Sequence, residues 1–456
     1  MTLLAGVSRI DITPPTGLWM SGYAFRPTGA VGVHDRLTAS TLVLRGPKQT
    51  VVIVSVDLIC LPTAYSDGVR TGIAEALGVP VSNVLLHCTH THGGPYVGTY
   101  GCMGHGDAAY EALLHQKLLT TAIAAMGSMV PVSLAFGRAP LRIGINRRKR
   151  EADGSISIGE QPDGIVDPGI RTIAINDKST GKVLCVLFNH GCHPTTMGGE
   201  NLLFTAEWPG EAARSLERQL TDAGLAVDEV IAMPLTGCCG DINPYPRGTW
   251  EDVANAGNAA ASAALQAIRN STPLEGRVGV SVAEAAMPVL PAASDAAETV
   301  SYWRTELENA HAAGADEGVL LHRAGLLKWA EMQLQRSVAS DTVETARFLV
   351  QHIDMGGADI LGFPAEMFVH YALDFEAQSG RNLLCTGYTN GCINYLPAAA
   401  DYSDGGYEVA EAWKYYQAPM FAPECEAVLR AEVYRLLGVV NPNMDPYPAS
   451  AAPRVA

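Results

Sequence analysis

Hydrophobic residues along this chain form two patterns: short β-branched runs and longer amphipathic stretches. The apolar runs at 50–61, 84–88 and 182–188 are rich in valine, leucine and isoleucine, which is typical of buried strands. The first and last runs precede segments 64–77 and 209–223, in which apolar residues recur at helical spacing. Strands alternating with helices predict an α/β fold with mixed β-sheets flanked by helices.

Other segments depart from this alternation. Residues 141–166 are charged and glycine-rich, which predicts a long loop or hairpin near the surface. Over residues 301–348, tryptophan and leucine recur at helical spacings among Glu, Arg and Gln, which predicts a helical insertion, more often a packed arm than a lid. We expect one catalytic unit over residues 1–440 and a flexible tail over residues 441–456.

Composition and charge narrow the partners. The chain has 456 residues, 48% of them hydrophobic and 17% charged, and can bury a large core. It has 31 Lys plus Arg and 47 Asp plus Glu, which gives a net charge of −16. Its longest run of basic residues is the short segment 147–150. Nucleic acid and anionic membrane surfaces are therefore expected to be poor partners, which favours a small-molecule substrate.

The N-terminal residues lack the basic and apolar regions of a signal peptide and run directly into a strand-like segment at 8–13. The longest apolar stretch, 51–61, is interrupted by Asp57 and is shorter than the ~20 residues of a spanning helix. We therefore expect a soluble, cytoplasmic protein with no integral membrane segment and with its ten cysteines reduced. No cysteine pair has C-x-x-C spacing, so we expect any metal to be held by nitrogen and oxygen.

Histidines follow two of the predicted strands. The sequence Thr89-His90-Thr91-His92-Gly93-Gly94 comes directly after the run 84–88. In an extended segment His90 and His92 share one face, which suits a metal ligand beside an acid/base group. Two histidines at a strand end can equally be hydrogen-bonded core or loop residues. His193 follows the run 182–188 and precedes a proline that prevents ordinary strand pairing.

Three later positions are candidates for the same site. The turn Gly240-Asp241-Ile242-Asn243-Pro244 offers backbone N–H groups and a side-chain amide that can stabilise an oxyanion, or it is merely a tight turn. Glu366 follows a Gly-Phe-Pro turn and is explained equally well as a solvated carboxylate at a helix start or as a metal ligand. Tyr395 alone indicates only packing.

Taken together and in their order along the chain, these motifs resemble those of the catalytic domain of neutral ceramidases, over roughly residues 5–435. The resemblance is carried by Thr89-His90-Thr91-His92-Gly93-Gly94-Pro95, Asn146-Arg147, His193-Pro194-Thr195-Thr196-Met197, Gly240-Asp241-Ile242-Asn243-Pro244, Phe363-Pro364-Ala365-Glu366, Asn394-Tyr395 and Tyr407-Glu408. It implies a ceramidase-type zinc hydrolase with one Zn²⁺ per chain, bound by His90, His193, Glu366 and Tyr395. It also implies that His92, Arg147 and Tyr407 surround the scissile group.

The chain differs from the family at Asn243, where ceramidases have a serine that is held to be central to amide cleavage. Asparagine cannot form an acyl-enzyme, so we expect a metal-activated water as the attacking group and Asn243 as an oxyanion donor. The β-rich C-terminal domain of ceramidases is not seen in this sequence either. We therefore expect hydrolysis of an amide, or of an ester or lactone, in a small or acylated substrate, with a true ceramidase as an alternative.

In the expected mechanism, zinc polarises the carbonyl and activates water, while His92 acts as general base and then as acid. Arg147, Tyr407 and Asn243 hold the substrate or its oxyanion. Asp57, Asp241 and His34 are further candidates that orient ligands or line the pocket, although a capped strand end explains Asp57 equally well.

Two other functional classes stay open at this point. One is a zinc-dependent lyase or carbohydrate-acting enzyme on the same scaffold, because loss of the serine frees the fold from acyl transfer. The other is a non-catalytic binding protein that kept the fold, which would be expected to have lost its metal ligands. The sequence also leaves a homo-oligomer open.

Overall fold

The computed structural model describes residues 2–98, 104–338, 344–440 and 442. Its largest element is a nine-stranded mixed sheet with strand order β12-β10-β9-β6-β1-β3-β4-β5, in which β14 pairs with β6. The strands are β1 (Leu4–Asp11), β3 (Thr38–Arg45), β4 (Thr50–Val56), β5 (Val84–Cys88), β6 (Val130–Pro140), β9 (Gly169–Asp177), β10 (Val183–His190), β12 (Ala226–Thr236) and β14 (Thr272–Pro273). β4 and β5 are parallel, as are β10 and β12.

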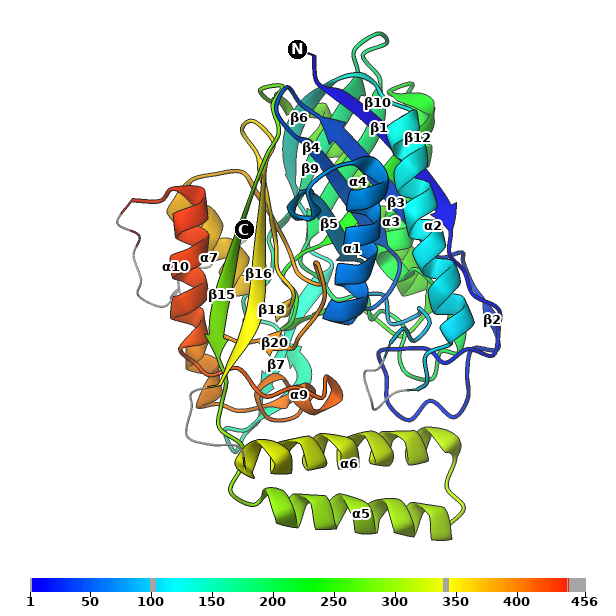
Figure 1. Ribbon diagram of the computed structural model, residues 1–456. Helices are drawn as coiled ribbons and strands as arrows, with labels where there is room; N and C mark the ends of the chain where they lie inside the picture. Colours follow the sequence, from blue (N-terminus) through cyan, green and yellow to red (C-terminus); the bar gives the residue numbers. More distant parts are fainter. Residues whose placement is uncertain (1, 99–103, 339–343, 441, 443–456) are drawn as a thin grey trace.

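Both faces of this sheet are buried, which explains the continuous apolar runs in its strands. In β4, Val52 and Val54 belong to the core beneath the helices, whereas Val51 and Ile53 belong to a second core on the opposite face. Helices cover the first face (Figure 1): α1 (Thr63–Leu77), α2 (Ala108–Gly127), α3 (Glu207–Asp222) and α4 (Trp250–Arg269). These elements confirm the predicted α/β class.

A four-stranded sheet, in the order β15-β16-β17-β19, packs on the other face of the large sheet. Its strands are β15 (Gly279–Pro288), β16 (Thr345–Asp354), β17 (Asp359–Gly362) and β19 (Leu383–Thr386). Helices α7 (Val369–Ser379) and α10 (Cys425–Leu437) cover its outer side (Figure 1), where a third core lies. The layers therefore follow the order helix, sheet, sheet, helix.

The charged segment 141–166 forms a hairpin of β7 (Gly144–Arg150) and β8 (Ile156–Gln161). The prediction of a surface position is wrong for part of it, because Asn146, Arg147 and Arg148 are buried. Their strand also pairs with β13 (Ile242–Pro244), which places these side chains inside the molecule.

The predicted helical insertion is a hairpin of two helices, α5 (Ala296–Ala312) and α6 (Glu317–Val338), which lies at one end of the molecule (Figure 1). Its predicted end at residue 348 is wrong, because from Thr345 the chain forms β16. There Phe348 and Val350 alternate into the third core, a period of two that the helical interpretation missed. Residues 441 and 443–456 of the predicted tail lie outside the described residues.

The remaining elements are short and lie within the connections between the longer strands and helices. They are β2 (Gly32–Val33), β11 (Leu203–Phe204), β18 (Glu366–Met367), β20 (Tyr395–Leu396), α8 (Tyr407–Ala410), α9 (Ala412–Tyr415) and 3-10 turns at Val81–Asn83 and Ala399–Tyr402. The described cysteines are all free. None of the described helices has both the length and the apolar character needed to cross a membrane.

Candidate metal centre and active site

Three imidazoles meet where β5 and β10 end. The Nε2 atom of His90 lies 3.2 Å from Nε2 of His193 and 3.4 Å from Nε2 of His92. His90 and His193 are fully buried, and the three residues can each offer one nitrogen within 4.8 Å of the others. The structure thus brings together residues that are 103 positions apart in the chain.

The backbone conformation of His90 differs from the expected extended one. β5 ends at Cys88, and His90 has a φ of 66°, a left-handed conformation that is uncommon for a residue with a side chain. The expected strand alternation is therefore wrong, although His90 and His92 do lie side by side. The turn is fixed because the His90 backbone N–H donates to Leu58 O (2.9 Å) and the Tyr388 ring stacks on the imidazole at 3.7 Å.

Backbone carbonyls fix the tautomers of two of these histidines. Nδ1 of His90 donates to Ile59 O at 2.7 Å, and Nδ1 of His193 donates to Cys239 O at 2.5 Å. Burial lowers the pKa of His193 to about 4, so its imidazole is neutral at neutral pH. The Nε2 atom of His193 therefore presents a lone pair to the centre of the cluster, and the Nε2 atom of His90 faces the same point.

Glu366 completes the cluster from β18, where it pairs with Tyr395 of β20. Its Oε2 atom lies 3.2 Å from His90 Nε2 and 3.1 Å from His193 Nε2. The Tyr416 hydroxyl donates to Oε1, and the Tyr388 hydroxyl donates to Oε2 at 3.3 Å. Burial alone raises the pKa of Glu366, but the facing imidazoles lower it well below its usual range.

This arrangement fits a metal ion. Two imidazole Nε2 atoms and one carboxylate oxygen converge within 3.2 Å, and the Nδ1 atom of each imidazole already donates to a backbone carbonyl. Converging acceptors repel one another unless a cation lies among them, and neutral histidines whose second nitrogen donates to a carbonyl are typical zinc ligands. His92 differs from the other two, because its Nδ1 atom is buried without a hydrogen-bond partner among the described residues.

Arg147 links the remaining predicted residues. Its guanidinium donates to Glu408 Oε1 (2.8 Å), to the Tyr395 hydroxyl oxygen (3.1 Å) and to Asn243 Oδ1 (3.3 Å). Tyr407 lies beside it, with the guanidinium carbon 5.9 Å from the ring centre. The Glu408 carboxylate also accepts from Arg148. Because one carboxylate is shared by two arginines, it neutralises the buried positive charge of Arg147 only in part.

The side-chain amide of Asn243 has a defined orientation. Arginine can only donate hydrogen bonds, so the atom facing Arg147 is the amide oxygen, which also accepts from the Thr195 hydroxyl at 3.4 Å. No acceptor in the described part of the chain lies within hydrogen-bond distance of the Asn243 amide nitrogen. The NH₂ group is thus available to a ligand.

These side chains line one cavity of about 250 Å³. His92, Arg147, Asn243, Glu366, Tyr395 and Tyr407 are among its lining residues. The structure therefore brings six of the eight predicted catalytic and metal residues to one wall, with His90 and His193 directly behind it.

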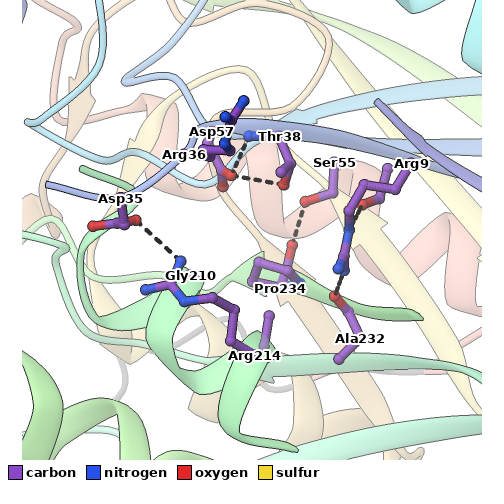
Figure 2. A pocket seen from close by; sticks show the side chains of 12 residues that line it. Arg9, Asp35, Arg36, Thr38, Ser55, Asp57, Gly210, Arg214, Ala232 and Pro234 are labelled. Carbon is purple, nitrogen blue, oxygen red and sulfur yellow. Dashed lines mark hydrogen bonds and ion pairs between the residues drawn. The ribbon is translucent and has the colours of Figure 1, made fainter. Parts of the chain in front are cut away.

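The three weaker candidates lie elsewhere. His34 is exposed and stacks on Trp250 at 3.7 Å, outside the residues that line this cavity. Asp241 accepts from the Val369 backbone N–H (2.9 Å) and from the Asn146 amide (3.2 Å), so it joins β7 to the start of α7. Asp57 lines a second cavity (Figure 2), where it accepts two hydrogen bonds from Thr38.

Several residues that support the site are not revealed by the sequence patterns. Tyr416 and Tyr388 hold Glu366, and Arg26 donates to the His92 carbonyl oxygen at 2.9 Å. Gly22 is required next to His92, because a Cβ atom there would lie 2.4 Å from the ring and its φ is +99°. Tyr388 lies in the segment 387–395, whose glycines could have drawn attention to it. Tyr416, Arg26 and Gly22 have no local sequence pattern that marks them as part of a site.

Comparisons with known proteins identify the family and the fold. Residues 3–305 match the model of the neutral/alkaline non-lysosomal ceramidase family, N-terminal domain. The neutral ceramidase from Pseudomonas aeruginosa shares the fold with a TM-score of 0.68 and 18% identity, over 96% of this chain and 73% of that one. A ceramidase complexed with C2 gives a TM-score of 0.71 and 18% identity, over 96% and 74% of the two chains. No curated protein is significantly similar to the chain.

The family match spans about two thirds of the chain and includes the segments that carry His90, His92, Arg147, His193 and Asn243. The structural neighbours extend the agreement to nearly the whole length. The resemblance expected from the motifs is thereby confirmed, and the chain belongs to the neutral/alkaline non-lysosomal ceramidase family.

Proposed function

We propose that the protein is a zinc-dependent hydrolase that cleaves an amide bond with water as the nucleophile. Family membership supports a hydrolase acting on amide bonds. The observation that supports the metal is the convergence of His90 Nε2, His193 Nε2 and Glu366 Oε2, with the Nδ1 atom of each histidine already bonded to a backbone carbonyl. The intact donor set also argues against a binding protein that merely kept the fold.

In this proposal His90, His193 and Glu366 hold one Zn²⁺, and Tyr395, whose hydroxyl lies beside Arg147, completes the set as the resemblance implies. When bound, zinc supplies a Lewis acid that polarises the substrate carbonyl and lowers the pKa of water. Tyr416 and Tyr388 keep the Glu366 carboxylate oriented toward the imidazoles.

His92 is the proposed general base and acid. Its Nδ1 atom is not tied to a carbonyl, unlike that of His90 and His193, so its tautomer is free to change as a proton moves. Its backbone is held by the Arg26 guanidinium, and the Tyr23 ring packs edge-on at 5.0 Å. His92 takes a proton from the attacking water and returns one to the leaving nitrogen.

Asn243, Arg147 and Tyr407 are the proposed groups around the developing oxyanion. The Asn243 NH₂ is free to donate, and Arg147 brings a positive charge whose position is fixed by Glu408. Asn243 has no nucleophilic atom, so the reaction proceeds without an acyl-enzyme. The same groups would act on an ester or a lactone.

The test combines metal analysis with labelled water. Purified protein is expected to contain about one zinc per chain, to lose N-acyl hydrolysis on chelation and to regain it with Zn²⁺. In heavy-oxygen water the acid product is expected to carry the label. Absence of stoichiometric zinc would contradict the metal site, and an unlabelled product would indicate elimination instead. N-acylsphingosine in the same panel decides whether the protein is a true ceramidase.

A further inference from the structure

Arg247 differs from the other charged residues that line the cavity. The cavity has two arginines, and Arg147 is paired with the carboxylate of Glu408. Arg247 is exposed, and its guanidinium donates to the Tyr23 hydroxyl at 3.3 Å. In the described part of the chain, no carboxylate lies within ion-pair distance of Arg247. A chain of net charge −16 thus leaves a cation unpaired at its candidate active site.

The Tyr23 side chain holds Arg247 close to the catalytic groups. Burial raises the pKa of Tyr23 to about 12, so the phenol is neutral. Its hydroxyl donates to Met197 O at 2.9 Å and can therefore only accept from Arg247. The Tyr23 ring contacts His92 at 5.0 Å, so the guanidinium lies about one tyrosine side chain away from the proposed base.

The cavity walls do not neutralise this cation. Glu366 is the carboxylate among the lining residues, and its oxygens already face His90 and His193 and accept from two tyrosines. Arg247 and Asn243 both line this cavity, so a ligand within it can contact both. Guanidinium groups bind carboxylates through paired, charge-assisted hydrogen bonds.

The size of the cavity points in the same direction. Its volume of about 250 Å³ lies below the roughly 300–1,000 Å³ of pockets for drug-sized ligands. Five of its lining residues are tyrosines, which present hydroxyl groups as well as rings. A cavity of this volume suits a short compound better than two long alkyl chains.

We propose that the substrate is a short amide that carries a carboxylate, with N-acyl amino acids as the simplest class, and that Arg247 binds this carboxylate. The inference rests on the proposed hydrolase function. One water is consumed: its OH adds to the acyl carbon, the C–N bond breaks, and the amine nitrogen takes up a proton. The products are a carboxylic acid and an amino acid.

The experiment compares an N-acyl amino acid with its neutral carboxamide, using wild type, Arg247→Gln and Arg247→Lys. Wild type is expected to prefer the carboxylate substrate by about tenfold in kcat/KM, because only this substrate makes the charge-assisted contact with Arg247. Arg247→Gln is expected to abolish this preference, mainly through KM, and Arg247→Lys to retain part of it. Arg45→Gln serves as the control and is expected to leave the preference unchanged, because it alters another exposed arginine that has no carboxylate partner within the described ranges.

Calorimetry at low temperature on zinc-loaded protein measures binding of the carboxylate substrate. This measurement distinguishes a failure of the role of Arg247 from a failure of the proposed hydrolase function. Hydrolysis of both substrates with equal efficiency, or an equal effect of Arg247→Gln on both, would overturn the role of Arg247 while leaving the hydrolase intact. Arg247-dependent binding without any hydrolysis would overturn the proposed function instead.

Discussion

Two cavities of the molecule, the one at the histidine cluster and the one in Figure 2, differ in whether their polar groups have partners. In the cavity of Figure 2, of about 280 Å³, Asp57 accepts from Thr38, Arg9 pairs with Glu217, and Arg214 pairs with Asp35. In the other cavity, His90, His193 and Glu366 direct acceptors at one point. Saturated pairs stabilise the fold, whereas converging unsatisfied groups indicate a ligand.

Hydrogen bonds link the residues of the cavity in Figure 2 to the loop that carries His90 and His92. Asp57 accepts from the Thr89 hydroxyl at 3.3 Å, and Asp35 accepts from the Thr205 hydroxyl at 2.5 Å. Thr89 precedes His90, and the Thr205 carbonyl accepts from Thr91 at 2.7 Å. The saturated cavity therefore supports the back of the histidine loop. A perturbed pKa is found in both places, since burial raises the pKa of Asp57 to about 6, so it does not identify the reactive one.

The largest effect is expected from a substitution that removes a metal ligand, because only the cavity at the histidine cluster is expected to bind zinc. His193→Ala removes one of the converging acceptors, so we expect loss of stoichiometric zinc and a drop in kcat/KM of about 10³-fold or more. Asp57→Asn, in the other cavity, is expected to keep its zinc. Elemental analysis and amide hydrolysis measure both. Full zinc occupancy in His193→Ala, with folding verified by circular dichroism, would break the comparison.

Asn243→Ala tests the free amide group of the reactive cavity. Removing one oxyanion donor is expected to lower kcat by about 10²–10³-fold, with zinc content unchanged. Steady-state kinetics give kcat and KM separately. A rise in KM at constant kcat would show that Asn243 binds substrate and does not stabilise the transition state.

Asp57 allows a test of the saturated cavity by pH. Burial raises its pKa to about 6, against 3.8 for the unperturbed group, so the folded state holds the proton more tightly than the unfolded state. Its stabilising contribution is present below pH 3.8 and is lost as pH rises through about 6. Relative to wild type, Asp57→Asn is therefore expected to gain about 3 kcal/mol of unfolding free energy across this range.

Urea denaturation at pH 4, 5, 6 and 7 measures this gain. Asp228→Asn, which alters an exposed aspartate on β12, is the charge-matched control. If the difference between wild type and Asp57→Asn is the same at every pH, the carboxylate is not titrating in the folded protein as expected.

The smallest effect is expected at the rim of the saturated cavity. Arg36 pairs with Asp11, but 79% of its side chain is exposed, so Arg36→Ala should cost about 0–1 kcal/mol of unfolding free energy. The urea midpoint at pH 7 reports this change. A loss above about 2 kcal/mol would show that the rim contributes to the fold as strongly as the buried pairs.

Local patterns predicted the layers of the fold well. Strand β4 takes up residues 50–56 of the run 50–61, and β10 begins within the run 182–188 and continues to His190, because strands buried on both faces are apolar throughout. The charged segment 141–166 was predicted as a loop or hairpin, and it is a hairpin. Its burial was not predictable, since Arg147 is charged locally and finds its partner Glu408 only 261 residues later.

The sequence by itself determined the α/β architecture, the histidines at strand ends and the family. Hydrophobic period and motif order are local properties that need no knowledge of contacts. Only the tertiary structure decided that His90 turns through a left-handed conformation and that Tyr416 and Tyr388 hold Glu366. It also decided that Arg147 pairs with a carboxylate, whereas Arg247 has none among the described residues. These features depend on which side chains meet across hundreds of residues, and packing selects those meetings rather than local sequence.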